Sequence, residues 1–243
     1  MHGILYGVGV GPGDPRLMTF LAADTIKKCE VLAVPARTRE QAVSYQIARG
    51  LLPELDQKEC IALAVPMTKD RTVLNAAYEQ AADLVEEQLK AGKDVACLTL
   101  GDPTIYSTYI YLHRIIKARG YETQIISGVP SFCAVSARLG DSLADRSEQL
   151  HIVPSAYGVE ETLSLSGTKV LMKAASKMDT VKKTLLEQKA GAVMVENCGM
   201  ENEMIFRGTE QIPDQAGYYS IIVVKEQQKM VKIGWFSLKC LRW

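Results

Sequence analysis

Two apolar segments of the chain each run into a Gly-Asp-Pro turn, and this repeated pattern constrains the fold strongly. Val95–Leu100 has the composition of a buried strand and stops at Gly101-Asp102-Pro103, while Gly3–Val10 runs into a loop that contains Gly13-Asp14-Pro15. Gly101 tolerates backbone angles that other residues avoid, Asp102 is a good helix N-cap, and Pro103 suits the first helical position. The pattern predicts a strand, a glycine turn and a helix start. In an open α/β sheet, ligands bind just beyond such strand ends.

The first of these loops is not a dinucleotide-binding fingerprint, although its glycines suggest one. Counting G-x-G-x-x-G from Gly7 places Pro12 at the third glycine position, and counting from Gly9 places Asp14 there. Prolines in the loop keep a helix from starting directly at a phosphate, and no Lys-Ser/Thr pair follows to complete a P-loop. The loop therefore predicts a close approach of bare backbone to a ligand, without a phosphate cradle.

Apolar strands alternate with helical patterns through the first half of the chain, so we expect an α/β fold with a mostly parallel sheet there. A helix capped by Thr19 should run to Lys28, and a long amphipathic helix should occupy 70–90. Further strands are expected at 31–35, 61–65 and 121–126, and further helices at about 107–118 and 132–139.

The second half predicts a smaller, mixed α/β sheet, because one helix, 178–189, is obvious between its later strands. Strands are expected at 150–153, 169–172 and 192–195, followed by an antiparallel pair, 204–209 with 218–224. We place the hinge at 127–131, which gives an N-terminal domain 1–127 and a C-terminal domain 128–243. Residues 225–243 fit no earlier pattern. They are either a terminal strand or an appended tail, and no functional argument is based on them.

Composition and charge exclude several classes of protein. Lys plus Arg and Asp plus Glu number 28 each, so no net field favours nucleic acid or a membrane surface. No apolar run is long enough to cross a bilayer, and the N-terminus lacks the pattern of a signal peptide. The 6 cysteines are scattered singly, which fits reduced thiols in the cytosol. The 3 histidines have no metal-ligand spacing, so we expect a cytoplasmic protein without a metal site.

An ordered set of motifs resembles the tetrapyrrole methyltransferases of the cobalamin and sirohaem pathways, over roughly residues 3 to 225. The set comprises Gly9-Val10-Gly11-Pro12-Gly13-Asp14-Pro15, Leu100-Gly101-Asp102-Pro103, Gly128-Val129-Pro130-Ser131, Val195-Glu196-Asn197 and Tyr219-Ser220-Ile221-Ile222-Val223-Val224. Within the family, residues 101–108 and 127–132 look most like the enzymes that methylate carbon 20 of precorrin-2 or cobalt-factor II. The uroporphyrinogen III enzymes have a second glycine where Leu100 stands and a proline where Ser127 stands.

The resemblance implies two α/β domains that form a cleft for S-adenosylmethionine, with S-adenosylhomocysteine as the product, and a homodimer as the usual assembly. Carried over by position, the residues expected around the cofactor are Pro12, Leu100, Gly101, Asp102, Ile105, Pro130, Ser131, Met172, Asn197, Cys198 and Ser220. Because the sulfonium is already a good leaving group, methyl transfer needs alignment more than acid–base chemistry, which explains the lack of an obvious catalytic triad.

The implied substrate is a tetrapyrrole with many carboxylates, so cations in the predicted loops are candidate partners. Lys173, at a predicted strand end, is the first choice. Arg37 and Tyr106 are further candidates for substrate binding, while Arg39, Lys69 and Arg71 read individually as solvated surface. A proton must leave the methylated carbon, and the sequence does not choose among its four conceivable acceptors, Tyr106, Asp102, Glu196 and His151.

Each site residue also has a purely structural interpretation. Met172 is a common core filler, Cys198 a small buried hydrophobe and Asn197 a turn residue. Three alternative functions stay open: methylation at another tetrapyrrole position, methylation of a protein acceptor as in diphthine synthesis, and a non-catalytic module that binds a tetrapyrrole or nucleotide. The sequence also leaves open whether the metal-free or the cobalt-loaded ring is the substrate.

Overall fold

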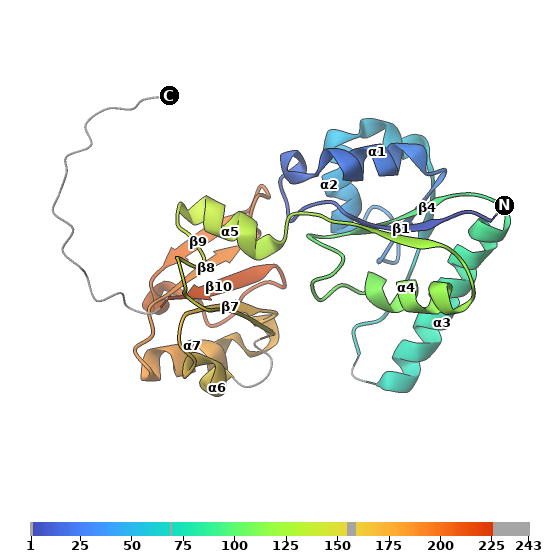
Figure 1. The fold of residues 1–243 in the computed structure, drawn as a ribbon. Coiled ribbons are helices and arrows are strands. Elements are labelled where there is room, and N and C mark those ends of the chain that lie inside the picture. The colour runs from blue at the N-terminus through green and yellow to red at the C-terminus, as the bar shows by residue number, and fades with distance from the viewer. Residues whose placement is uncertain (1, 69, 155–158, 226–243) are drawn as a thin grey trace, which may run out of the picture. The chain divides into compact units, whose positions relative to one another are not determined.

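The computed structural model describes residues 2–68, 70–154 and 159–225, which form two compact α/β units with one sheet each (Figure 1). Unit 1 holds the described chain up to Ser142 together with Glu196–Met204, and unit 2 holds the other described residues from Leu143 onward. Helix α5 (Ser131–Leu139) therefore belongs to unit 1, whereas the boundary proposed from the sequence, at residue 127, assigns it to the second domain. Most of the segment 225–243 lies outside the described residues.

The sheet of unit 1 has the strand order β3-β2-β4-β1-β5, and every adjacent pair in it is parallel. Its strands are β1 (Leu5–Gly9), β2 (Val31–Val34), β3 (Glu59–Ala62), β4 (Val95–Thr99) and β5 (Thr123–Ile126). The three central strands are buried along their whole length, which is why their sequences are continuously small and apolar. Because all five strands run the same way, their carboxyl ends meet at one edge of the sheet.

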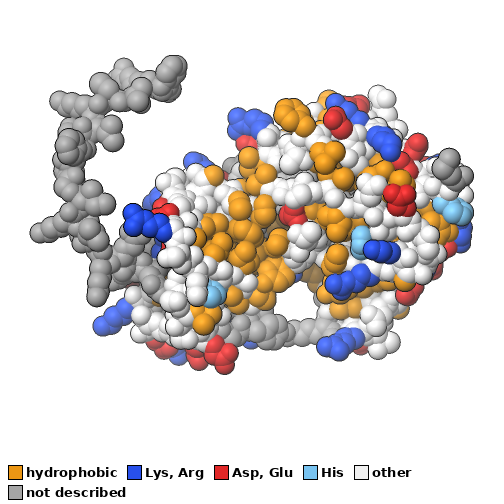
Figure 2. Space-filling view, viewed as in Figure 1, with side chains coloured by type: hydrophobic (Ala, Val, Ile, Leu, Met, Phe, Trp, Pro, Cys, Tyr) orange, Lys and Arg blue, Asp and Glu red, His pale blue; other side chains and the backbone are white. Residues whose placement is uncertain are grey.

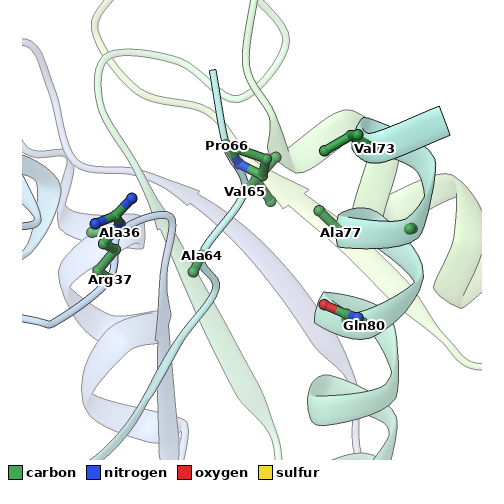
Figure 3. A pocket seen from close by; sticks show the side chains of 9 residues that line it. Ala36, Arg37, Ala64, Val65, Pro66, Val73, Ala77 and Gln80 are labelled. Carbon is green, nitrogen blue, oxygen red and sulfur yellow. The ribbon is translucent and has the colours of Figure 1, made fainter. Parts of the chain in front are cut away.

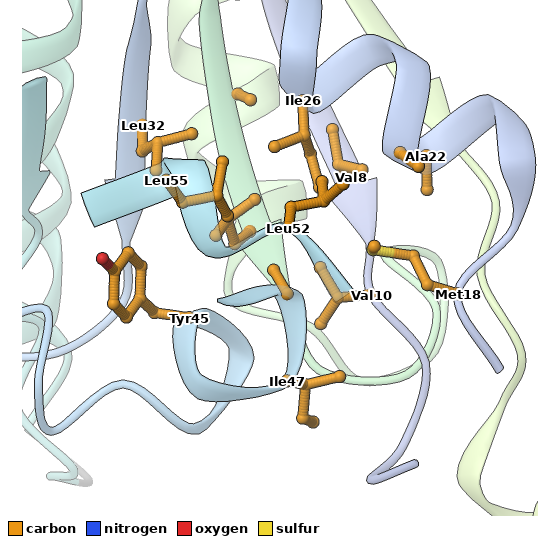
Figure 4. Close-up of a cluster of buried hydrophobic side chains, with 14 of the residues drawn as sticks. Val8, Val10, Met18, Ala22, Ile26, Leu32, Tyr45, Ile47, Leu52 and Leu55 are labelled. Carbon is orange, nitrogen blue, oxygen red and sulfur yellow. The ribbon is translucent and has the colours of Figure 1, made fainter. Parts of the chain in front are cut away.

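Helices cover both faces of this sheet (Figure 1). Successive strand residues point to opposite faces. One face, with Val8 and Leu32, packs against α1 (Phe20–Lys28) and α2 (Val43–Leu51), as Figure 4 shows. The other face packs against α3 (Arg71–Lys90) and α4 (Tyr109–Ala118). Two short 3-10 helices, Pro15–Leu17 and Pro53–Gln57, lie on the same side of the sheet as α1 and α2.

Capping residues fix the starts of two of these helices, and the cap at Thr19 is the predicted one. The hydroxyl of Thr19 accepts the Ala22 N–H at 3.1 Å, and Asp70 accepts the N–H groups of Thr72 and Val73, so both side chains satisfy donors that a helix start leaves unpaired. Helix α2 was not predicted, because Ala42 at its start makes no capping hydrogen bond.

The helix that follows β4 does not start at Asp102-Pro103, although the range expected for it, about 107–118, agrees with α4. Residues 101–108 form turns, and α4 begins only at Tyr109. Asp102 does accept the N–H of Thr104, as an N-cap would, but its other oxygen bonds to the loop after β5. This tertiary contact keeps the loop after β4 out of the helix.

Unit 2 carries the predicted mixed sheet, in the order β6-β7-β10-β8-β9. Its strands are β6 (Leu150–Pro154), β7 (Thr168–Met172), β8 (Ala192–Glu196), β9 (Met204–Arg207) and β10 (Ser220–Val224). β6 is parallel and β10 antiparallel to β7. The expected pair of β9 with β10 is wrong, because β10 lies between β7 and β8. Helices α6 (Val159–Leu163) and α7 (Met178–Glu187) pack with the apolar core of this sheet.

On the face shown in Figure 2, Lys and Arg side chains of the described residues lie scattered among Asp and Glu side chains. This mixture is what the equal totals of 28 basic and 28 acidic residues lead one to expect. No helix among the described residues combines the length and the apolar character that crossing a bilayer requires.

Candidate functional site

Three loops meet through bare backbone at the carboxyl edge of the parallel sheet. Gly9 ends β1, Gly101 follows β4, and Gly128 follows β5. A Cβ atom on Gly128 would lie 2.2 Å from the Gly101 carbonyl oxygen, and one on Gly9 would lie 2.6 Å from the same oxygen. Side chains at either position would push the loops apart, so glycine permits this junction. Sequence reasoning found the role of Gly101, whereas that of Gly9 and Gly128 depends on contacts between distant segments.

A two-residue bridge fixes the loop after β1 against the loop after β4. Gly101 N–H donates to the Gly11 carbonyl oxygen at 2.9 Å, and Gly11 N–H donates back at 3.4 Å. Both glycines have positive φ, +79° at Gly11 and +71° at Gly101. A Cβ atom on Gly101 would have no atom closer than 3.8 Å. Gly101 is therefore required by its backbone angle and not by lack of space. The bridge holds the buried Pro12 beside the loop that begins at Leu100.

Asp102 is buried, and both of its carboxylate oxygens are occupied by donors of the protein. Oδ1 accepts the Thr104 N–H at 2.8 Å and its hydroxyl at 2.5 Å. Oδ2 accepts the Ser127 hydroxyl at 2.5 Å and the Gly128 N–H at 2.9 Å. Burial alone would raise the pKa of Asp102, but these four hydrogen bonds outweigh burial and hold the pKa below its usual value. The carboxylate is thus ionised, and the donors use its acceptor positions.

In the rest of the loop after β4, exposed side chains alternate with half-buried ones from Thr104 to Thr108. Tyr106 is 43% exposed and has a φ of +50°, an uncommon angle for a bulky residue. Ile105 is half-buried, and its N–H donates to the Asp102 carbonyl oxygen. On the neighbouring loop, Pro130 and Ser131 are half-buried at the start of α5. The candidates from these two loops thus lie at the same edge as Gly101.

Asn197 and Cys198 also belong to unit 1, within the turn that follows β8. A Cβ atom on Gly13 would lie 2.1 Å from the Cys198 carbonyl oxygen, so this turn packs directly against the loop after β1. Asn197 and Gly199 have positive φ values of +53° and +77°. Burial raises the pKa of the Cys198 thiol to about 11, so the thiol stays protonated. We expected these residues to act from the C-terminal domain, but their contacts place them beside Gly13.

Glu203 holds this turn in place. Its Oε2 accepts the Gly199 N–H at 2.8 Å, and its Oε1 accepts the Nε–H of Arg138 at 2.5 Å. Burial would raise the pKa of Glu203, but these contacts hold it below its usual value. The turn is therefore tied to α5 as well as to the loop after β1.

The remaining candidates, Met172, Lys173 and Ser220, lie in unit 2. Met172 ends β7 and pairs with Ile221 of β10, so all three residues lie at one end of these two strands. Ser220 is buried and donates its hydroxyl hydrogen to the Gly217 carbonyl oxygen at 2.8 Å. Lys173 has a φ of +57°, and burial lowers the pKa of its ammonium. The structure thus gathers the candidates into two groups, one in each unit.

Arg37 follows β2 and lines a pocket of about 530 Å³ in unit 1 (Figure 3). Nothing local in the sequence indicated this pocket, because its lining comes from segments as far apart as Ala36 and Gln80. Of the other candidates, His151 contacts the Ser166 carbonyl oxygen through Nε2 at 2.9 Å, Glu196 is buried, and Lys69 lies outside the described residues. The described residues contain no group of His, Cys, Asp and Glu that could hold a metal ion.

Comparison with known proteins identifies a family and several relatives. A model of the tetrapyrrole (corrin/porphyrin) methylases matches residues 4–213. A probable cobalt-precorrin-2 C(20)-methyltransferase of Methanocaldococcus jannaschii is 35% identical, covering 70% of this chain and 71% of the relative. The cobalt-precorrin-2 C(20)-methyltransferase of Salmonella typhimurium is 30% identical over 93% and 98% of the two chains. A precorrin-2 C(20)-methyltransferase of a Sinorhizobium species is 29% identical over 91% and 95%.

Solved structures show the same fold. A cobalt precorrin-4 methyltransferase superposes with a TM-score of 0.74 at 18% identity, covering 91% of this chain and 94% of that one. A uroporphyrin-III C-methyltransferase of Thermus thermophilus, solved with S-adenosylhomocysteine, gives a TM-score of 0.67 at 19% identity, covering 92% and 98%. The expected two-domain α/β architecture is thereby confirmed.

Proposed function

Because the chain belongs to the tetrapyrrole (corrin/porphyrin) methylase family, we propose that it transfers a methyl group from S-adenosylmethionine to carbon 20 of precorrin-2 or cobalt-precorrin-2 in cobalamin biosynthesis. The observation that carries this proposal is the similarity to three relatives named as C(20)-methyltransferases, at 29% to 35% identity. The chain is thus assigned as an S-adenosylmethionine-dependent C-methyltransferase.

The loops of unit 1 fit the cofactor through their backbone. The junction of Gly9, Gly101 and Gly128 brings three strand ends together without side chains, and such a surface can approach a compact ligand closely. We assign the cofactor contacts of unit 1 to Pro12, Leu100, Gly101, Ile105, Pro130, Ser131, Asn197 and Cys198. Those of unit 2 are Met172 and Ser220.

The cofactor supplies a methyl group that is activated by its bond to a sulfonium sulfur. When the methyl group is transferred, this sulfur is the leaving group and becomes the neutral thioether of S-adenosylhomocysteine. The work of the protein is therefore alignment, and rigid backbone loops provide it. Asp102 contributes by fixing the loop after β4 to the loop after β5, since its oxygens are already hydrogen-bonded within the protein.

Proton removal from the methylated carbon needs a different group from Asp102. A carboxylate that accepts four hydrogen bonds and has a lowered pKa is a poor base. His151 already contacts the Ser166 carbonyl oxygen. We propose Tyr106, whose exposed side chain stands on the loop after β4 itself, as the residue next to the reacting carbon.

Methylation at carbon 11 is the second candidate function, since a precorrin-4 C(11)-methyltransferase of Rhodococcus erythropolis is 29% identical over 84% of this chain. The relatives do not decide whether the substrate is precorrin-2 or cobalt-precorrin-2, because the Sinorhizobium and Salmonella proteins, named for one form each, are 29% and 30% identical.

We also propose a homodimer, which light scattering of the purified chain measures directly.

The test is methyl transfer from labelled S-adenosylmethionine to precorrin-2, cobalt-precorrin-2 and precorrin-4, with the labelled position located by NMR. We expect label at carbon 20, and we expect transfer to the metal-free ring to persist in excess chelator. Label at carbon 11 would support the second candidate. Binding of cofactor and tetrapyrrole without any transfer would instead support a non-catalytic module.

A further inference from the structure

A pocket opens in unit 1 where β2 and β3 end and α3 begins (Figure 3). Its volume is about 530 Å³, within the range of roughly 300–1,000 Å³ that small-molecule sites occupy. Three segments line it: Ala36 and Arg37 after β2, Ala64–Pro66 after β3, and the first half of α3. The sheet and a helix thus hold it from two sides.

The α3 wall of the pocket is mostly apolar. It consists of Val73, Ala76, Ala77 and Gln80, whose spacing of three and four residues places them on one face of the helix. Two of the four are alanines, so no bulky side chain rises between the ends of this face. Such a surface suits the face of a conjugated ring.

Arg37 supplies positive charge at this pocket. It is exposed and makes no hydrogen bond or ion pair with another described residue. Arg39, on the same loop, is engaged: its Nε donates to Glu40 at 2.9 Å, and its Nη1 donates to the Asp56 carbonyl oxygen at 3.2 Å. An arginine that no described residue engages is available to form two parallel hydrogen bonds to a carboxylate.

The pocket lies beside the glycine loops along the same edge of the sheet. β2 pairs with β4 through Ala33 and Cys97, and β4 pairs with β1. Neighbouring strands are about 4.8 Å apart, so the end of β2 is roughly 10 Å from the end of β1. A ligand that reached from the loop after β4 into the pocket would have to extend from β4 to its neighbour β2, a distance of about 4.8 Å.

We propose that this pocket holds one edge of the tetrapyrrole, with its ring face against α3 and an acidic substituent of that edge paired with Arg37. The identity of the ligand rests on the proposed function. The pocket would then fix which part of the macrocycle faces the glycine loops, and so which carbon is methylated.

The experiment compares Arg37→Ala with Arg39→Ala, which removes the same charge from the same loop but not from the pocket. A second variant, Ala77→Leu, fills the pocket and keeps a good helix former in α3. The KM for cobalt-precorrin-2, the Kd for S-adenosylhomocysteine and the thermal midpoint are measured for each, at two salt concentrations.

We expect Arg37→Ala and Ala77→Leu to raise the KM for the tetrapyrrole about tenfold, which corresponds to about 1.4 kcal/mol. Arg39→Ala should leave this KM unchanged, Arg37→Lys should give an intermediate value, and added salt should reduce the effect of Arg37→Ala. The Kd for S-adenosylhomocysteine should not change in any variant.

An unchanged KM in both Arg37→Ala and Ala77→Leu, in a protein that methylates carbon 20, would overturn the pocket assignment and leave the proposed function intact. A wild-type protein that transfers no methyl group would overturn the proposed function. In that case, equilibrium binding of cobalt-precorrin-2 decides on the pocket: weaker binding to both variants supports it, and equal or absent binding refutes it.

Discussion

Ser127 donates its hydroxyl hydrogen to Oδ2 of Asp102 over 2.5 Å, and this hydrogen bond joins two loops that lie far apart in the sequence. The Gly128 N–H donates to the same oxygen at 2.9 Å, while Thr104 uses the other oxygen twice. One buried carboxylate therefore sets the position of the loop after β4 relative to the loop after β5.

We expect Asp102→Asn to reduce both the free energy of unfolding and the affinity for S-adenosylhomocysteine. Asparagine keeps the shape but replaces one acceptor oxygen with an NH2 group, so the donors on that side lose their partner. A buried donor left unsatisfied costs about 1–3 kcal/mol. Urea unfolding and calorimetry on one preparation measure the two quantities.

Ser127→Ala is the matched control, because it removes one of the four hydrogen bonds and leaves that of Gly128. Its cost should be smaller than that of Asp102→Asn. Should Asp102→Asn lower stability while cofactor affinity stays the same, the positions of these loops would not matter to cofactor binding.

Gly101→Ala and Gly128→Ala should differ sharply in their effect on stability. Alanine at Gly101 has room and is opposed by the positive φ alone, which costs about 1–2 kcal/mol. Alanine at Gly128 would place its Cβ 2.2 Å from the Gly101 carbonyl oxygen, so backbone must move. Thermal unfolding of both variants tests this, and a Gly101→Ala protein that unfolds at the lower temperature contradicts it.

Two substitutions of Lys173 separate its charge from its backbone. Lys173→Ala and Lys173→Gly remove the same ammonium, and we expect both to weaken tetrapyrrole binding equally with little change in cofactor affinity. Glycine tolerates the φ of +57° better than alanine does, so Lys173→Gly should be more stable by about 1 kcal/mol. Binding titrations and thermal midpoints measure both. A loss of cofactor affinity with unchanged tetrapyrrole affinity would rule out a substrate role.

Glu86 should contribute stability that depends on acid pH. It pairs with Lys90 at 2.8 Å and with Arg119 at 2.6 Å, linking α3 to the end of α4. The hydrogen bond with Lys90, followed by those with Tyr121 and Arg119, lowers the pKa of Glu86 from 4.5 to about 2. A carboxylate with a lowered pKa stabilises the fold above its unfolded pKa and loses this effect as the pH falls through the folded pKa.

Glu86→Gln should therefore be less stable than the wild type at neutral pH, and the difference should shrink as the pH falls from 4.5 to about 2. Urea unfolding across this range gives the difference directly. A gap that stayed constant with pH would mean that Glu86 acts through packing and not through its charge.

The sequence predicted those elements whose signals are local. Thr19 caps its helix as expected, a helix runs through most of 70–90 as expected, and the buried runs of β1 and β4 are continuous in the sequence. Helix α2 escaped prediction because it starts without a capping side chain and carries β-branched Val43 and Gly50, both unfavourable for helix formation.

Long-range contacts explain the errors. The helix after β4 does not start at Pro103, because Asp102 is bound by Ser127 and Gly128, which no nearby residue reveals. The sequence predicts that strand β10 pairs with β9, its neighbour in sequence. In the structure, β10 lies between β7 and β8. For the candidate site, the motifs indicated the loops around Gly101, while the convergence with Gly9 and the pocket beside Arg37 arise only in three dimensions.

The turn Glu196–Met204 has a consequence for how the protein is made. Its backbone covers Gly13, yet the ribosome adds it only after the strands β6, β7 and β8. A nascent chain that ends at Ser142 holds all five strands of the parallel sheet but not this turn, so the loop after β1 waits uncovered until most of unit 2 has been synthesised. Although domains generally fold as units from the N-terminus during translation, the first unit here cannot reach its final form until the first three strands of the second unit have been synthesised.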